Sequence, residues 1–256
     1  MKSVIENSTT NKTECNRANR FIITGFFKKK SRNLIALMAS PSLMSYDNKV
    51  ETVIISAKEK VIMEPQEAVP FLYEVFDASL PRLGPGNNAS TVKALNMLIP
   101  DGHPFRTNAN SPDLKILDIG CGNGAQTIQL AKHLEGTVTA MDNHRPYLKE
   151  LMRRARAEAV DGRIRPYEKD MNHHGLGGNS FHVIWAEGPL YVADFRNGLS
   201  VCRDLLVTRG LMAVSELCWL RKDSPSECRS FFADEYPPMT DIETNLCPIK
   251  NAGYTD

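Results

Sequence analysis

The chain has 256 residues, of which 42% are hydrophobic and 24% charged, and its formal net charge is +1. This composition is typical of a globular protein, and the length suffices for one large α/β domain. No apolar run approaches the ~20 residues of a membrane span, so no membrane-spanning helix is expected. Residues 1–62 hold 11 Lys+Arg and 5 Asp+Glu, whereas residues 63–256 hold 20 and 25. The mildly acidic body argues against a nucleic-acid partner.

The six cysteines are scattered and form no CxxC pair. Neither a zinc site nor a redox motif is therefore indicated, and no metal site is expected. Isolated cysteines fit a reducing compartment, so we expect a cytoplasmic protein.

The first 62 residues differ in character from the rest. An apolar patch over 21–27 precedes a basic run over 28–32, and residues 50–63 predict a strand or a hairpin. The segment is basic and poor in acids, as targeting leaders are, but it carries no cleavage-site pattern. We expect a poorly ordered leader of unclear role, dispensable for binding, followed by a functional chain that starts near Met63.

The next stretch predicts a helical lid over 63–113. Apolar residues over 66–78 are spaced for one face of a helix. A loop of turn residues separates this helix from a second one, which Asn88 or Ser90 is expected to cap and which runs to Leu98.

A glycine-rich turn is the centre of the chain. Five mostly apolar residues, 115–119, run directly into three glycines at alternate positions, and an amphipathic run over 126–134 follows. Glycine is needed where the backbone turns sharply or comes close to a ligand. The new helix directs unpaired N–H groups at whatever lies over the turn. A strand, a tight turn and a helix are predicted, with a cofactor cradle formed by Gly120, Cys121, Gly122 and Gly124.

Two cofactors compete for this turn. Gly120, Gly122 and Ala125 fit the GxGxxA form of a dinucleotide fingerprint, which indicates an NAD(P)-binding oxidoreductase. Gly124 makes the pattern GxGxG, and Asp118 lies two residues before the first glycine. A carboxylate there suits a ligand with an ammonium group and repels a pyrophosphate. These two details favour S-adenosylmethionine (SAM).

Strands and helices alternate regularly after the turn. The pattern predicts helices over 126–134, 146–159 and 195–206, and further strands over 137–141, 163–167, 181–186 and 211–216. Such alternation gives a Rossmann-like, doubly wound, mostly parallel sheet flanked by helices. Ligands of these sheets bind past the carboxyl ends of the strands. Four acidic residues are expected at such ends: Asp118, Asp142, Asp170 and Glu187.

Asp142, followed by Asn143, is the expected ribose ligand. It lies 24 residues after Asp118, close to the ~20-residue offset of a ribose-binding acid. One carboxylate can accept hydrogen bonds from two vicinal hydroxyls. The alternative for Asp142 is a cap of the helix that follows.

The pattern Asp-x-Gly-x-Gly-x-Gly from Asp118 to Gly124, with Asp142 ending the next strand, resembles the class I SAM-dependent methyltransferases. Residues 184–191 and 215–219 are similar to a small-molecule group that is often labelled by analogy with ubiquinone/menaquinone C-methyltransferases. The resemblance implies a methyl transfer from SAM to a small-molecule acceptor. Runner-up functions are the oxidoreductase and a truncated, non-catalytic SAM-binding protein.

The resemblance also implies roles for single residues. Asp170 is expected to take the adenine amino group, with the Met171 N–H against the ring. Glu187 is expected to meet the ammonium group of SAM or the acceptor, and Tyr191 to line the acceptor pocket; these two are the only candidates for catalysis. An Arg-x-Gly-Pro-Gly loop in the relatives covers the pocket, and its matches here are Arg82, Gly84, Pro85 and Gly86.

The end of the chain departs from the resemblance. Helices are expected over 224–236 and 245–252, with Pro248 confined to the first turn of the second. The resemblance implies seven strands, numbered along the chain and arranged in the order 3-2-1-4-5-7-6. After the fifth, over 211–216, the chain has no room for strands 6 and 7. We therefore expect an open edge on the strand over 211–216, which predicts self-association. The SAM-binding domain is expected to span 114–256.

Overall fold

In the computed structural model, the described parts of the chain are residues 72–107, 114–220, 222–224 and 226–255. The backbone of three short strands is also described: β1 (Phe21–Ile23), β2 (Thr52–Ile55) and β3 (Lys60–Met63). β2 and β3 pair antiparallel, which confirms the hairpin expected near residues 50–63. The basic run over 28–32 lies outside the described residues.

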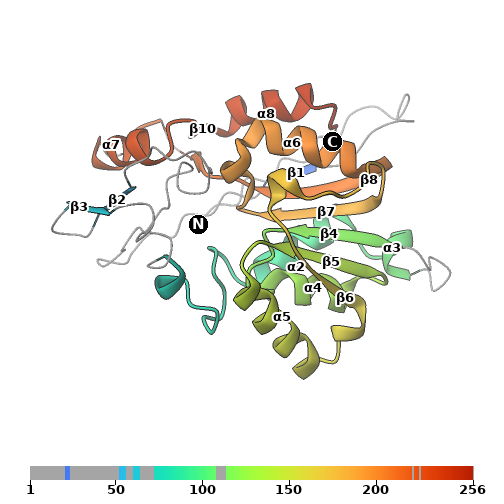
Figure 1. Cartoon of the computed structure of the whole chain (residues 1–256). Helices are drawn as coiled ribbons and strands as arrows, with labels where there is room; N and C mark the ends of the chain where they lie inside the picture. Colours follow the sequence, from blue (N-terminus) through green and yellow to red (C-terminus); the bar gives the residue numbers. More distant parts are fainter. Residues whose placement is uncertain are drawn as a thin grey trace.

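The main sheet is parallel throughout (Figure 1). Its order is β1-β8-β7-β4-β5-β6. The five later strands are β4 (Lys115–Ile119), β5 (Thr137–Asp142), β6 (Ile164–Glu168), β7 (Phe181–Glu187) and β8 (Leu206–Ser215). The predicted doubly wound sheet is confirmed, and each strand begins within five residues of its expected start.

Helices cover both faces of this sheet (Figure 1). One face carries α2 (Asn88–Leu98), α4 (Ala125–His133) and α5 (Arg145–Ala157). The other carries α6 (Phe195–Leu205) and α8 (Ile242–Asn251). Shorter pieces connect them: α3 (Pro104–Thr107), η2 (Asp161–Arg163), η3 (Met171–His173) and η4 (Leu190–Ala193).

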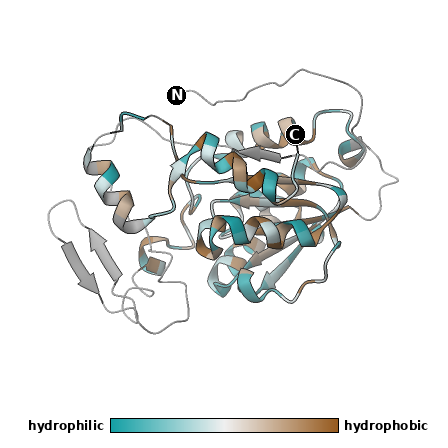
Figure 2. Cartoon of the chain, turned by 90° about the horizontal axis from the view of Figure 1, so that it is seen from above, coloured by the Kyte–Doolittle hydropathy of each residue, from teal (hydrophilic) through white to brown (hydrophobic). Residues whose placement is uncertain are grey.

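Strand alternation divides the core into two layers. On β4, Ile116 packs into the layer beneath α2, α4 and α5, and Leu117 packs into the layer beneath α6 and α8. Both side chains are fully buried, and each such burial is worth about 1.5–3 kcal/mol. Figure 2 shows hydrophobic and hydrophilic residues interleaved along the flanking helices, as one-sided burial requires.

The lid differs in detail from the prediction. Residues 72–75 form the described part of the first helix, which ends three residues earlier than expected; residues 66–71 lie outside the described part. The cap of α2 is Asn87, not Asn88 or Ser90, because the Asn87 side chain accepts from the Ser90 N–H. Ser90 completes the capping box by accepting from the Asn87 N–H.

The edge of β8 is not open, contrary to the prediction. β1 pairs with it in parallel over three residues, with Phe21 opposite Met212 and Ile23 opposite Val214. The prediction failed because it considered only strands that follow β8 in sequence, whereas this partner comes from the leader. At least these three leader residues therefore belong to the sheet.

The C-terminal part contains the two expected helices, α7 (Ser226–Glu235) and α8. α8 starts three residues early, capped by Asp241, so Pro248 lies in its interior rather than in its first turn. β9 (Cys218–Trp219) and β10 (Thr240–Asp241) form a separate short parallel pair. Within the described ranges no strand joins the main sheet after β8, and no helix is long and apolar enough to cross a bilayer.

Candidate functional site

The glycine turn has the backbone that its sequence predicts. Gly120, Gly122 and Gly124 have φ values of 61°, 53° and 85°. Residues other than glycine rarely adopt this left-handed region of the backbone. A Cβ on Gly120 would lie 2.5 Å from Pro189 Cβ, and one on Gly122 would lie 3.0 Å from Leu83 Cδ1. The Cys121 N–H donates to the Met141 carbonyl at 3.0 Å and ties the turn to β5. The turn is thus a cradle that has no room for side chains.

Asp118 lies beneath the turn rather than at the surface. Its exposed fraction is 0%, and it accepts a hydrogen bond from Thr127 Oγ1 at 2.5 Å, with Gln126 Nε2 at 3.5 Å. Burial raises the pKa of Asp118 to about 8, although the bond from Thr127 opposes the shift. Through these contacts Asp118 fixes the first turn of α4 against β4, so its direct role is to position the cradle.

Asp142 is placed at the cradle itself. Its Oδ2 accepts from the Gly122 N–H at 2.9 Å, and its Oδ1 accepts from the His144 N–H at 2.8 Å. Burial raises the pKa of Asp142, and these two hydrogen bonds oppose that shift. Each oxygen keeps a lone pair for a further donor, such as a ribose hydroxyl. Asp142 does not cap the helix that follows, because the cap residue of α5 is His144 and no side chain caps this helix. Asn143, beside Asp142, is exposed.

Glu187, at the end of β7, joins three parts of the chain. Its Oε2 accepts from Arg82 Nη1 at 2.6 Å, and its Oε1 accepts from Thr91 Oγ1 at 2.8 Å and Trp185 Nε1 at 2.9 Å. The exposed fractions of the Arg82 and Glu187 side chains are 10% and 20%. The lid loop, α2 and the sheet are therefore held together at one carboxylate.

The lid loop is fastened over the cradle by two further side chains. Asn123 Nδ2 donates to the carbonyls of Ala78 and Leu80, at 3.1 and 2.6 Å. Arg154 Nη2, on α5, donates to the same two carbonyls at 3.0 and 2.8 Å. Sequence reasoning missed both residues, because an asparagine or arginine that binds carbonyls far along the chain leaves no local pattern.

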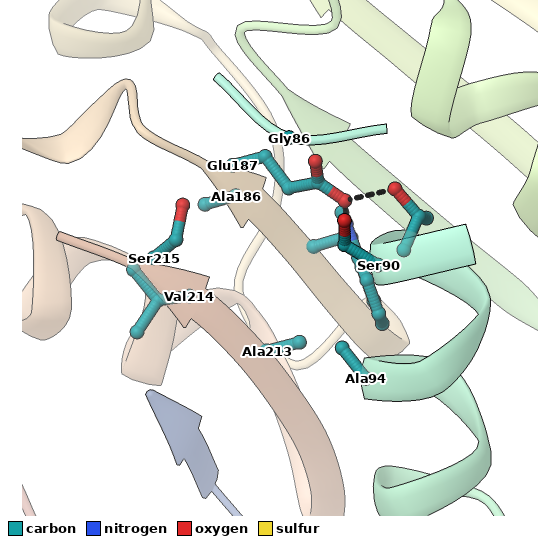
Figure 3. A pocket seen from close by; sticks show the side chains of 10 residues that line it. Gly86, Ser90, Ala94, Ala186, Glu187, Ala213, Val214 and Ser215 are labelled. Atoms are coloured by element: carbon teal, nitrogen blue, oxygen red, sulfur yellow. Dashed lines mark hydrogen bonds between the residues drawn. The ribbon is translucent and has the colours of Figure 1, made fainter. Parts of the chain in front are cut away.

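A small pocket lies beside this network (Figure 3). Gly86 and residues of α2 form one wall, and the ends of β7 and β8 form the other, through Glu187 and Ser215. Glu187 and Ser215 are direct neighbours in the register of the two strands. Arg82 and Gly86 thus lie where the lid meets the sheet ends, as expected of a loop that covers a pocket.

Asp170 and Met171 lie at the far end of the same edge, after β6. Asp170 caps η3 by accepting from the Asn172 N–H at 2.8 Å, and Met171 packs against the core layer beneath α6. Tyr191 lies in η4, after β7, and its ring meets that of Tyr236 edge to face at 5.8 Å. The acidic residues expected at strand ends are all found there.

Glu216 is a site residue that sequence reasoning missed. It directly follows β8 and has an exposed fraction of only 6%. Burial raises the pKa of Glu216 to about 7, opposed by hydrogen bonding with the Leu217 N–H and with Tyr236. The other four acids were identified because each is a carboxylate at the end of a predicted strand. The same signal applies to Glu216, the last residue of the predicted strand over 211–216.

The comparisons with known proteins agree with this geometry. A family model described as a methyltransferase domain matches residues 116–210. Over these residues, which make up less than half of the chain, the protein is similar to methyltransferase domains. The glycine cradle and the ends of β4 to β7 all lie within the matched residues.

Two of the curated proteins similar to this chain are named as methyltransferases. The sterol 24-C-methyltransferase erg6 of Aspergillus fumigatus is 24% identical over 151 residues, which cover 55% of this chain and 40% of that protein. The uncharacterized methyltransferase YodH of Bacillus subtilis is 29% identical over 119 residues, covering 46% and 50%. The match thus spans half or less of each of these relatives.

Solved structures share the fold at low identity. Phosphoethanolamine N-methyltransferase 2 of Haemonchus contortus, in complex with SAM, has a TM-score of 0.56 at 18% identity and covers 73% of this chain and 41% of that one. Geranyl diphosphate C-methyltransferase of Streptomyces coelicolor has a TM-score of 0.52 at 17% identity, covering 64% and 59%. The [4+2]-cyclase SpnF has a TM-score of 0.51 at 17% identity, covering 65% and 56%.

Proposed function

We propose that this protein binds SAM over the glycine turn and transfers its methyl group to a small-molecule acceptor. Asp142 holds the ribose hydroxyls, and Asp170 with the Met171 N–H holds the adenine. Gly120, Cys121, Gly122 and Gly124 let the backbone approach the ligand, and Arg82, Gly86 and Glu187 close the site from the lid side. Asp118 holds the turn in place from below.

One observation carries this proposal: Asp142, at the end of β5, has its carboxylate at the glycine turn, and each of its oxygens keeps a lone pair for a ribose hydroxyl. A Cβ on Gly120 or Gly122 would meet Pro189 or Leu83, so only bare backbone fits at these two positions. The similarity of residues 116–210 to a methyltransferase domain supports SAM over a dinucleotide as the ligand.

The residues present are suited to alignment rather than to acid–base chemistry. The sulfonium of SAM supplies an electrophilic methyl group and a neutral leaving group. The chain has to hold the acceptor in line with the methyl carbon and exclude water, which can supply several kcal/mol. The lid network of Arg82, Thr91 and Glu187 is placed to do this, because it ties the lid loop and α2 to the end of β7.

Calorimetric titration with SAM, S-adenosylhomocysteine and NADH tests the cofactor. We expect the first two to bind and NADH not to bind; binding of NADH alone would turn the proposal into an oxidoreductase. Asp142→Ala is expected to weaken SAM binding by about 1–3 kcal/mol, because the ribose hydroxyls lose a charged partner. Asp142→Asn, which preserves size, serves as a second variant, and Asp204→Ala, an exposed acid on α6, is the control.

The acceptor requires a separate experiment, because a shared fold does not fix the reaction, as the cyclase among the similar structures illustrates. The relatives are named for a sterol, geranyl diphosphate and phosphoethanolamine, which supports a small-molecule acceptor here. Incubating a metabolite extract with methyl-labelled SAM should label small molecules. Label found only in protein or RNA contradicts the proposal, and no label from a SAM-binding protein favours the non-catalytic alternative. Location in the cytoplasm is supported by the five described cysteines, which are all free.

A further inference from the structure

A buried carboxylate with one unpartnered oxygen directly follows β8. Glu216 Oε1 accepts from the Leu217 N–H at 3.0 Å. Its Oε2 is buried and has no hydrogen-bond partner within 3.5 Å among the described residues. No lysine, arginine or histidine of the described chain lies within ion-pair distance of Glu216. An ionised carboxylate in this position lacks the donor that its burial requires.

Two tyrosines lie near this carboxylate. Tyr236 has an exposed fraction of 5%, and its hydroxyl is close enough to Glu216 to lower the pKa of that carboxyl. Tyr191 meets Tyr236 edge to face at 5.8 Å and feels the charge of Glu216. Tyrosine rings attract cations through their π-faces, so a carboxylate among tyrosines suits an ammonium group. A second carboxylate, Asp194, is near enough to raise the pKa of Glu216 and adds to the negative potential.

The cluster lies at the same edge of the sheet as the pocket. Ser215, the preceding residue, lines the pocket that also contains Glu187 (Figure 3). Tyr236 directly follows α7, and the described α7 side chains other than Phe232 are exposed. Figure 1 shows α7 off to the side of the sheet. Access of a small molecule to Glu216, which is 6% exposed, therefore requires Tyr236 to move aside.

We propose that Glu216, Tyr191 and Tyr236 form a binding site for the protonated amine of a small molecule. Glu216 Oε2 accepts a hydrogen bond from the ammonium group, and the tyrosine rings surround its charge. This molecule is the methyl acceptor if the proposed methyl transfer holds; the amine site itself does not depend on that function.

Binding of benzylamine, compared with benzyl alcohol, tests the site. Calorimetry is run on the full chain with and without S-adenosylhomocysteine. We expect the amine to bind about ten- to a hundredfold more tightly than the alcohol, as a charge-assisted hydrogen bond allows. Glu216→Gln should remove this preference, whereas Glu243→Gln, an exposed acid on α8, should keep it. Equal binding of amine and alcohol to the native protein would overturn the proposal.

The pH dependence of binding gives a readout that does not rely on a folded variant. The ammonium group binds the ionised form of Glu216, whose pKa is raised to about 7. Benzylamine affinity should therefore fall about tenfold per pH unit below pH 7 and level off above it, while benzyl alcohol affinity stays flat. The groups that face Glu216 are Tyr191, Tyr236, Asp194 and Cys218. The pKa values of the two tyrosines and of Cys218 are raised, so these groups stay neutral near pH 7.

The two proposals fail in different ways. Amine binding that depends on Glu216 without any SAM binding supports this site and contradicts the methyltransferase function. SAM binding together with equal affinity for amine and alcohol supports the function and contradicts this site.

Discussion

The two ends of the sheet edge are built differently. At β4 and β5, the carboxyls of Asp118 and Asp142 have hydrogen-bond partners from α4 and from the glycine turn. At β8, Glu216 Oε2 has no such partner among the described residues, and the helix nearby exposes nearly all of its described side chains. In the first region both carboxyls are held by hydrogen bonds from the chain itself. In the second, one carboxylate oxygen is left for a donor from outside, which the proposed amine site would use.

The largest expected effect comes from filling the cradle. In Gly124→Ala the new Cβ overlaps the buried Leu151 side chain at a φ of 85°. We expect a loss of about 2–5 kcal/mol in the free energy of unfolding, from backbone strain plus overpacking. Gly188→Ala is the matched control, because its φ is 89° but nothing lies within 4 Å of the added Cβ. Chemical denaturation should show the larger loss for Gly124→Ala; equal losses would mean that the cradle is not tightly packed.

The next effect, smaller for each pH unit, comes from the buried carboxyl of Asp118. The pKa of Asp118 is raised from 3.8 to about 8, so the folded protein keeps a proton that the unfolded chain has lost between about pH 4 and pH 8. The unfolding free energy should therefore fall as pH rises through this window, by up to about 1.4 kcal/mol per pH unit. Asp118→Asn should remove that contribution and the exposed control Asp204→Asn should not. Identical pH profiles of Asp118→Asn and native protein would contradict the burial of this carboxyl.

The smallest effect concerns local motion and needs no mutation. Hydrogen exchange should show little protection for α7 and strong protection for α5, which buries Tyr147, Leu148, Leu151 and Ala155. Saturating benzylamine should slow exchange in α7 and leave α5 unchanged. Strong protection of α7 in the free protein would remove the contrast between the two ends of the edge.

The sequence predicted the parts of the fold that local patterns control. The strand, turn and helix around Gly120 could be predicted from the glycine spacing and the apolar periodicity, because both patterns lie within a short stretch of sequence. The Arg82–Glu187 pair was not predicted as a pair, because its members are 105 residues apart and each was assigned separately to the ligand. The partner of β8 was missed for the same reason. Nothing in the sequence of a three-residue strand in a basic leader indicates which strand it pairs with.

The parallel pairing of β1 with β8 has a consequence for synthesis of the chain. β1 leaves the ribosome early, but its partner begins only at Leu206. At 5–20 residues per second, the wait is roughly ten to forty seconds. During that time Phe21–Ile23 have no partner strand, so this edge of the sheet can close only after β8 has been synthesised.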